Sequence, residues 1–175
     1  MACGCPSERG RVLRESTLIF VTVGTQLPFD RLMKGMDTIS RELGLDVVAQ
    51  VHRMPAWSTD IKCFEKLTPE EFEGYFKAAD VVVSHAGVGS IISARRVGRP
   101  IILYPRRSEL GEHRNDHQAA TARQLGTAEG IRVAWNDREL RELLINRADL
   151  MAGRGLGAEH EKLIANLAAI IHAVR

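Results

Sequence analysis

The stretch Asp80-Val-Val-Val-Ser-His-Ala-Gly-Val-Gly-Ser90 decides how this chain is expected to fold. Its three consecutive valines predict a buried strand, because β-branched runs are typical of parallel sheets covered on both faces. The strand ends at Ser84-His85, and two glycines then lead into an apolar segment with helical character. The turn leaves unpaired N–H groups at the helix start, where the helix dipole also favours an anion such as phosphate. From these residues alone, a phosphate site and a plain turn without a ligand are equally good interpretations.

The segments on either side of this stretch repeat its alternation of strand and helix. Further strands are predicted at residues 18–23, 46–50, 61–65, 100–104 and 131–134, and helices at 31–43, 69–79, 90–97, 115–125, 137–146 and 158–172. This alternation predicts an α/β fold, a Rossmann-like, mainly parallel sheet with helices on both faces. Ligands of such sheets bind beyond the carboxyl ends of the strands. The loops at 24–30, 85–90 and 105–118 therefore form the candidate site.

Several helix ends carry capping residues. Thr68-Pro69-Glu70-Glu71 combines an N-cap threonine, a proline at the first helical position and a glutamate placed for a capping box. Asp30 is placed to cap the helix at 31–43, and Gly44 and Gly98 are expected to end two helices. Glycines at 153, 155 and 157 predict a flexible joint before the last helix.

The composition is that of an ordinary globular protein. The 175 residues fit one domain, expected at 17–175, after a loose extension at 1–16. A net charge of +2 gives no reason to expect a nucleic-acid partner. Three cysteines predict neither a disulfide framework nor a zinc site, which favours the reducing cytoplasm. No apolar run reaches the roughly 20 residues that span a bilayer, and no signal peptide is recognised.

The loop at 105–118 is the second dense group of polar residues. Its donors and acceptors suit the hydroxyls of a sugar and the oxygens of a phosphate. His113 and His117 are four residues apart, but the helix is expected to begin between them and no third ligand follows, so no metal site is predicted. The alternative is a solvated surface loop in which Asn115 or Asp116 caps the next helix.

The loop after the first strand also has two interpretations. Gly24 lets the backbone approach a ligand or a neighbouring domain, or else forms a tight turn before a helix. Leu27 and Phe29 in this loop, like Trp57 further on, either form an exposed surface for a protein or membrane, or pack beneath their own loops.

Four segments together resemble the donor-binding domain of family 28 glycosyltransferases. They are Phe20-Val-Thr-Val-Gly-Thr25 followed by Pro28-Phe29, the stretch from Ala79 to Ser90, Gly98-Arg-Pro100, and Asn115-Asp-His-Gln118. The chain is similar to small stand-alone versions of this domain. One is the catalytic subunit of the two-chain N-acetylglucosaminyltransferase of dolichol-linked oligosaccharide synthesis, and another is its bacterial counterpart in exopolysaccharide assembly. The run from Tyr104 to Gln118 looks like the bacterial group.

The resemblance implies the C-terminal half of a GT-B fold that holds a UDP-sugar as substrate, without a cofactor or a metal. It implies an inverting transfer to a polyprenyl-diphosphate-linked saccharide in polysaccharide synthesis. The acceptor and the general base would belong to a separate, membrane-associated subunit. The chain would then act in a heteromer, in the cytoplasm at the inner face of the membrane, and would be active only with that partner.

Site roles follow from the same resemblance. The turns at 24–25 and 84–90 would face the diphosphate and nucleoside, His117 and Gln118 the sugar, and Arg106 or Arg107 would stabilise the leaving charge. Many family members carry a ribose-binding glutamate where this chain has Ser93. The expected donor-binding residues are Gly24, Thr25, Ser84, His85, Gly87, Val88, Gly89, Ser90, Ser93, Arg106, Glu112, His113, Asn115, His117 and Gln118.

Two other functions stay open on the sequence. A regulatory module that senses a sugar nucleotide and controls a partner would use the same motifs. A sugar-nucleotide epimerase has a similar fold but normally carries both domains in one chain. The donor sugar and the acceptor are not specified by any of these residues.

Overall fold

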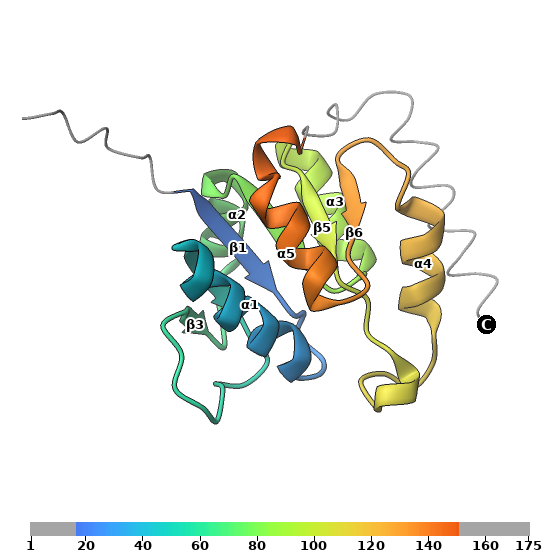
Figure 1. Cartoon of the computed structure of the whole chain (residues 1–175), viewed down its shortest axis with the longest axis horizontal. Coiled ribbons are helices and arrows are strands. Elements are labelled where there is room, and N and C mark those ends of the chain that lie inside the picture. The colour runs from blue at the N-terminus through green and yellow to red at the C-terminus, as the bar shows by residue number, and fades with distance from the viewer. Residues whose placement is uncertain (1–16, 151–175) are drawn as a thin grey trace, which may run out of the picture.

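The computed structural model describes residues 17–150, which form a six-stranded parallel sheet (Figure 1). The sheet order is β3-β2-β1-β4-β5-β6, and every neighbouring pair is parallel. The strands are β1 (Leu18–Thr22), β2 (Asp46–Gln50), β3 (Lys62–Phe64), β4 (Val81–Ser84), β5 (Ile101–Leu103) and β6 (Ile131–Val133). The predicted α/β class with a Rossmann-like parallel sheet is confirmed.

Helices cover both faces of the sheet, as predicted. They are α1 (Asp30–Leu43), α2 (Pro69–Ala78), α3 (Val88–Val97), α4 (His117–Leu125) and α5 (Asp137–Ile145), with 3₁₀ turns η1 (Ser108–Leu110) and η2 (Arg147–Asp149). Successive strand residues point to opposite faces, so Val81 and Val83 pack with α1 and α5 while Val82 packs with α2, α3 and α4. This alternation divides the core into two apolar layers, one on each side of the sheet.

Phe20 anchors α2 against the sheet. Its ring is fully buried and lies 5.6 Å from Phe72, 5.4 Å from Tyr75 and 5.4 Å from Phe76, centroid to centroid. Burying a phenylalanine side chain contributes about 1.5 to 3 kcal/mol, and the aromatic contacts add to it. The same contacts fix the position of Phe72, which matters for the site described below.

Most predicted helix ends are confirmed, and one is wrong. The Thr68 hydroxyl accepts a hydrogen bond from the Glu71 N–H at 3.2 Å, and the Glu71 carboxylate accepts one from the Thr68 N–H at 2.8 Å. Gly44 and Gly98 end α1 and α3 with φ of +62° and +67°. Asp30, however, is the first helical residue and not the cap. Phe29 holds the N-cap position without a side-chain capping bond, and the residue is buried in the core.

The sheet order creates a crevice at the carboxyl end of β1. After β1 the chain runs outward to β2 and β3 and then returns to β4 on the other side of β1. The loop after β1 therefore leads to α1 on one face, while the loop after β4 leads to α3 on the other. Diverging connections of this kind leave a crevice in which open α/β sheets bind their ligands.

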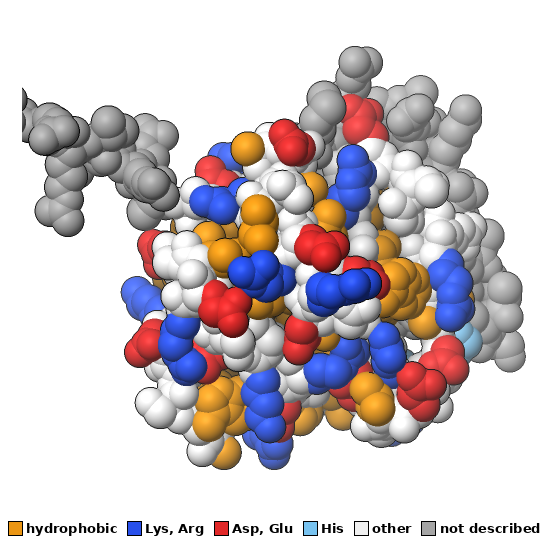
Figure 2. All heavy atoms as spheres, in the orientation of Figure 1, with side chains coloured by type: hydrophobic (Ala, Val, Ile, Leu, Met, Phe, Trp, Pro, Cys, Tyr) orange, Lys and Arg blue, Asp and Glu red, His pale blue; other side chains and the backbone are white. Residues whose placement is uncertain are grey.

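On the face formed by α1 and α5, positive and negative side chains are interspersed (Figure 2). No helix between residues 17 and 150 is long and apolar enough to cross a membrane. The predicted extension at 1–16, the glycine joint and the helix at 158–172 lie outside the described residues.

Candidate active site

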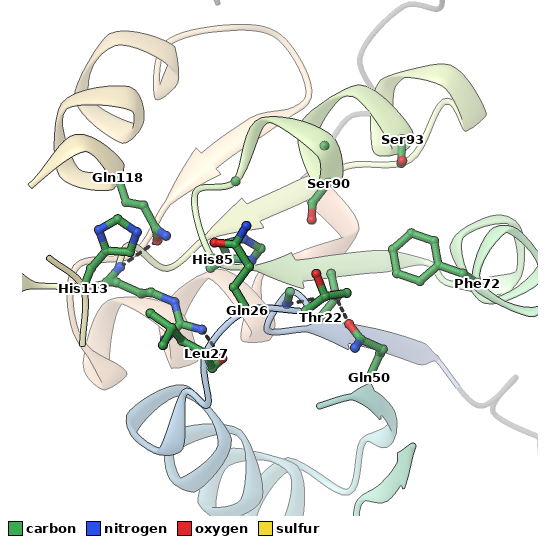
Figure 3. Close-up of a pocket in the computed structure, with 15 residues that line it drawn as sticks. Thr22, Gln26, Leu27, Gln50, Phe72, His85, Ser90, Ser93, His113 and Gln118 are labelled. Atoms are coloured by element: carbon green, nitrogen blue, oxygen red, sulfur yellow. Dashed lines mark hydrogen bonds between the residues drawn. The ribbon is translucent and has the colours of Figure 1, made fainter. Parts of the chain in front are cut away.

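A cleft of about 530 Å³ lies at this crevice (Figure 3). The loops after β1, β4 and β5 contribute about half of its lining residues, α3 contributes three more, and β1, β2, α2 and α4 each contribute one. The lining residues are Thr22, Gly24, Thr25, Gln26, Leu27, Gln50, Phe72, His85, Gly87, Gly89, Ser90, Ser93, Arg106, His113 and Gln118.

The imidazole of His85 lies between two glycines, and this position explains why both are glycine. A Cβ atom on Gly24 would lie 2.7 Å from Cε1 of His85, and one on Gly87 would lie 2.2 Å from Nε2. Gly24 also has a φ of +80°, which side chains disfavour. The ring is thereby held in the middle of the cleft wall, where Nδ1 lies 3.3 Å from the Ser84 hydroxyl.

His85 is a neutral group in this position. Burial, together with the positive charge of Arg106, lowers the pKa of His85 to about 4. At pH 7 the ring therefore carries no charge and can offer a ligand only a neutral hydrogen bond or contact surface.

The N-terminus of α3 opens into the cleft beside His85. Gly87 is its N-cap and provides no side-chain cap, and the first turn contains no acidic residue. The first intrahelical bond runs from Ile91 N–H to Gly87 O, so the N–H groups of Val88, Gly89 and Ser90 precede it. These donors and the helix dipole make this point of the cleft suitable for an anion.

The two ends of the cleft differ in chemistry (Figure 3). Phe72 and Ser93 lie at one end, next to the Thr22 hydroxyl, which donates to Gln50 Oε1 at 2.7 Å. His113 and Gln118 lie at the other end. One end thus combines an aromatic ring with hydroxyls, and the other is built from an imidazole and an amide.

Arg106 is built into the wall and does not point freely at a ligand. Its side chain is 2% exposed, and its Nη atoms donate to the carbonyls of Val23 at 2.9 Å, Leu27 at 2.7 Å and Pro28 at 2.6 Å. Burial lowers its pKa to about 10, with Glu112 opposing the shift. Arg106 therefore stays charged at pH 7 and adds a positive potential to the wall. Arg107 donates to the Trp135 carbonyl at 2.5 Å and does not line the cleft, so of these two arginines only Arg106 lies at the cleft.

The structure brings ten of the expected residues into one cleft and leaves five outside its lining. Ser84 is fully buried in the sheet, and Glu112 is engaged by Arg31. The side-chain oxygen of Asn115 lies 3.0 Å from His113 Nδ1 and accepts the His117 N–H at 3.4 Å, so this side chain faces its own loop. Val88 and His117 are the other two that do not line the cleft.

Five lining residues were missed from the sequence: Thr22, Gln26, Leu27, Gln50 and Phe72. Thr22 and Gln50 are polar residues at the ends of apolar strands, a signal that could have been used. Leu27 is 40% exposed whereas Phe29 is buried. Of the two interpretations of this loop, the exposed surface therefore applies to Leu27 and packing beneath the loop applies to Phe29.

The described part of the cleft lining contains no carboxylate. In addition, no group of three or more His, Cys, Asp or Glu side chains within residues 17–150 is arranged to hold a metal ion. The donors available to an anion there are backbone and neutral side-chain groups, backed by the charge of Arg106.

Comparison with known proteins identifies the domain. A family model, the glycosyltransferase family 28 C-terminal domain, matches residues 18–155. The comparison with curated proteins gave no match.

Solved structures with the same fold include CalG4, the calicheamicin glycosyltransferase, at 17% identity and a TM-score of 0.61 over 77% of this chain. The glycotransferase of kitacinnamycin is 18% identical, with a TM-score of 0.58 over 84% of this chain. ALG13 is 17% identical, with a TM-score of 0.56 over 81% of this chain. The match spans only 36% of CalG4 and 39% of the kitacinnamycin enzyme, but 90% of ALG13.

These structural likenesses agree with the sheet order and with the crevice beyond β1 and β4, and the fold corresponds to the C-terminal half of a GT-B glycosyltransferase. The family match covers most of the chain and nearly all of its described part. The chain belongs to the family of glycosyltransferase family 28 C-terminal domains.

Proposed function

We propose that this chain is the donor-binding subunit of an inverting glycosyltransferase that uses a UDP-sugar. The observation that carries the proposal is the uncapped N-terminus of α3, which opens into a cleft whose described lining has no carboxylate. A diphosphate is an anion of the kind that backbone donors at a helix N-terminus bind. Membership of the family and the likeness to glycosyltransferases support the same assignment.

The two ends of the cleft give the donor a direction. The nucleoside lies toward Phe72 and Ser93, where an aromatic ring can contact the base and a hydroxyl can meet the ribose. The diphosphate lies at α3, and the sugar lies toward His113 and Gln118. Gln118 accepts the Arg106 N–H through Oε1 at 3.2 Å, which leaves its amide N–H groups to serve as donors to sugar hydroxyls.

The reaction follows from this placement. An acceptor hydroxyl oxygen bonds to the anomeric carbon while the bond from that carbon to the UDP oxygen breaks, and the electron pair leaves with UDP. The N–H groups at the start of α3 stabilise the charge that grows on the diphosphate, supported by the buried charge of Arg106. The acceptor proton passes to a base on the acceptor half.

The acceptor half belongs to a partner subunit at the inner face of the membrane, and the acceptor is a polyprenyl-diphosphate-linked saccharide of polysaccharide synthesis. In support, the chain spans 39% and 36% of two glycosyltransferases but 90% of ALG13, so a solved chain of similar extent exists. A regulatory module that binds a sugar nucleotide and controls a partner is the alternative, because it would use the same cleft.

Calorimetric titration tests the donor site with UDP and with UDP-N-acetylglucosamine, UDP-glucose, UDP-galactose and UDP-glucuronate. UDP and at least one UDP-sugar should bind the wild type. Gln118→Ala should lower the affinity for the UDP-sugar by about tenfold, which corresponds to the loss of one or two hydrogen bonds. Gln124→Ala is the matched control, because Gln124 lies on the same helix, is exposed and does not line the cleft. Absence of binding by every nucleotide would refute the donor site.

The same variants separate the two functions once the chain is combined with its acceptor-binding partner. A transferase requires that Gln118→Ala lower the rate of sugar transfer by the pair. Full transfer by the pair, with weakened nucleotide binding, would favour the regulatory module.

A further inference from the structure

An ion pair outside the cleft lining joins the first turn of α1 to the loop between β5 and α4. Arg31, in the first turn of α1, donates through Nε to Glu112 Oε1 at 2.7 Å and through Nη2 to Glu112 Oε2 at 2.9 Å. The two side chains are only 22% and 13% exposed. Two parallel bonds between a guanidinium and a carboxylate fix orientation as well as distance.

Arg31 is itself held on the sheet side. Its guanidinium lies 4.3 Å from the centre of the Tyr104 ring, and Nη2 also donates to the Pro105 carbonyl at 2.8 Å. The Tyr104 hydroxyl in turn donates to Asp137 Oδ1 at 2.5 Å. These contacts fix the position of the Arg31 side chain.

Glu112 is equally tied to the loop between β5 and α4. Its Oε2 accepts the Arg107 N–H at 2.9 Å, and its carbonyl lies 3.4 Å from Arg106 Nη1. This loop makes few backbone hydrogen bonds of its own, those of the turn at η1 among them. The next residue after Glu112 is His113, which lines the cleft.

We propose that the Arg31–Glu112 pair positions the sugar end of the cleft and thereby sets affinity for the sugar without setting affinity for the nucleoside diphosphate. The proposal rests on the proposed function for the direction in which the donor lies. The nucleoside end is built from α2, α3 and β2, and neither Arg31 nor Glu112 contacts Phe72, Ser93 or Gln50 through any of the hydrogen bonds described above. Glu112 is thus a positioning residue and not a direct ligand of the donor.

Glu112→Gln tests this assignment because it keeps the shape of the side chain and removes its charge. Binding of UDP and of the tightest UDP-sugar from the same panel is measured by calorimetry. Affinity for the UDP-sugar should fall by about tenfold, because the sugar end loses its support. Affinity for UDP should not fall, because removing the negative charge of Glu112 takes no positive charge away from Arg106 beside the diphosphate.

Glu42→Gln provides the control. Glu42 pairs with Arg141 at 2.9 Å, but both side chains are about half exposed and the pair joins α1 to α5 away from the cleft. This variant should leave both affinities unchanged. Equal losses for UDP and the UDP-sugar in Glu112→Gln, or no loss for either, would overturn the positioning role while the wild type still binds donor. Failure of the wild type to bind UDP would instead overturn the proposed function itself.

Amide hydrogen exchange gives a readout that does not need a ligand. In Glu112→Gln the amides of the loop between β5 and α4 should exchange faster than in the wild type, while those of α3 should not change. Unchanged exchange in the loop would also overturn the positioning role.

Discussion

At the scale of single residues, the neutral state of His85 has a consequence for stability. The pKa of His85 is about 4 in the folded protein, because of burial and the charge of Arg106, against about 6.5 in an unfolded chain. Between these values the unfolded chain binds a proton that the folded protein does not. The free energy of unfolding therefore falls as the pH falls from 6.5 to 4, by about 2 kcal/mol at pH 5.

Urea denaturation of the wild type and of His85→Gln at pH 7.5 and pH 5 measures this contribution. The loss on acidification should be smaller in the variant by about 2 kcal/mol. His52→Gln, which replaces an exposed histidine, should keep the full loss. An equal loss in the wild type and in His85→Gln would show that His85 is not the group responsible.

Residues of the site differ in how far the sequence could predict them. His85 and its glycines follow from a local pattern, because a strand, a turn and a helix start are consecutive in the chain. Phe72 could not be predicted, because its place at the cleft depends on how α2 packs against Phe20 in another element. The position of Arg106 was also beyond reach, since its partners are backbone carbonyls near residues 23–28, far away in sequence.

At the scale of elements, α3 carries the clearest prediction. Gly89 lies in its first turn, is exposed, and has open space where a Cβ would be. Gly89→Asp should raise the free energy of unfolding by about 0.5 to 1 kcal/mol, because it removes a helical glycine and places a carboxylate at the positive end of the dipole. The same carboxylate should weaken UDP binding by about tenfold or more, because it repels the diphosphate.

Gly89→Asp is thus expected to raise the free energy of unfolding and to lower the affinity for UDP. Gly89→Asn is the neutral control of nearly equal size and should weaken UDP binding much less. The two effects are measured by denaturation and by calorimetry on the same samples. If Gly89→Asp and Gly89→Asn bound UDP equally well, the diphosphate would not lie at this helix end.

The elements themselves could largely be predicted, because apolar runs and capping residues act locally. Every predicted strand and helix within the described residues is present, with ends that differ by a few residues. The caps show the limit of local reasoning. Asp116 does hold the N-cap position of α4, but its carboxylate accepts the Ser108 hydroxyl at 2.6 Å instead of capping the helix. The Asp116 carboxylate therefore binds Ser108, eight residues away, and not the N–H groups of its own helix.

At the scale of the whole molecule, the proposed function gives this cleft the donor half of a transfer reaction. The described lining offers donors for the diphosphate and the sugar, but no carboxylate that could take the acceptor proton. His85 is neutral, but it is wedged between Gly24 and Gly87 in the wall, so its ring has little freedom to meet an incoming acceptor. The base is therefore expected on the acceptor half, together with the surface that binds the lipid-linked saccharide.

This division predicts how the purified chain behaves. Alone, it should bind UDP with the affinity that it has in the complete enzyme, because the described cleft is built within the domain. Its rate of sugar transfer should be lower by about a hundredfold or more, since general-base catalysis alone contributes about 10² to 10⁴ and positioning of the acceptor adds to it. Transfer is measured with a lipid-linked saccharide and the UDP-sugar that binds best, first with the chain alone and then with its acceptor-binding partner added. The partner without the chain controls for transfer that the chain does not cause. Transfer at the full rate by the chain alone would mean that the base lies within these 175 residues, and a search would then begin with His113, which lines the sugar end of the cleft.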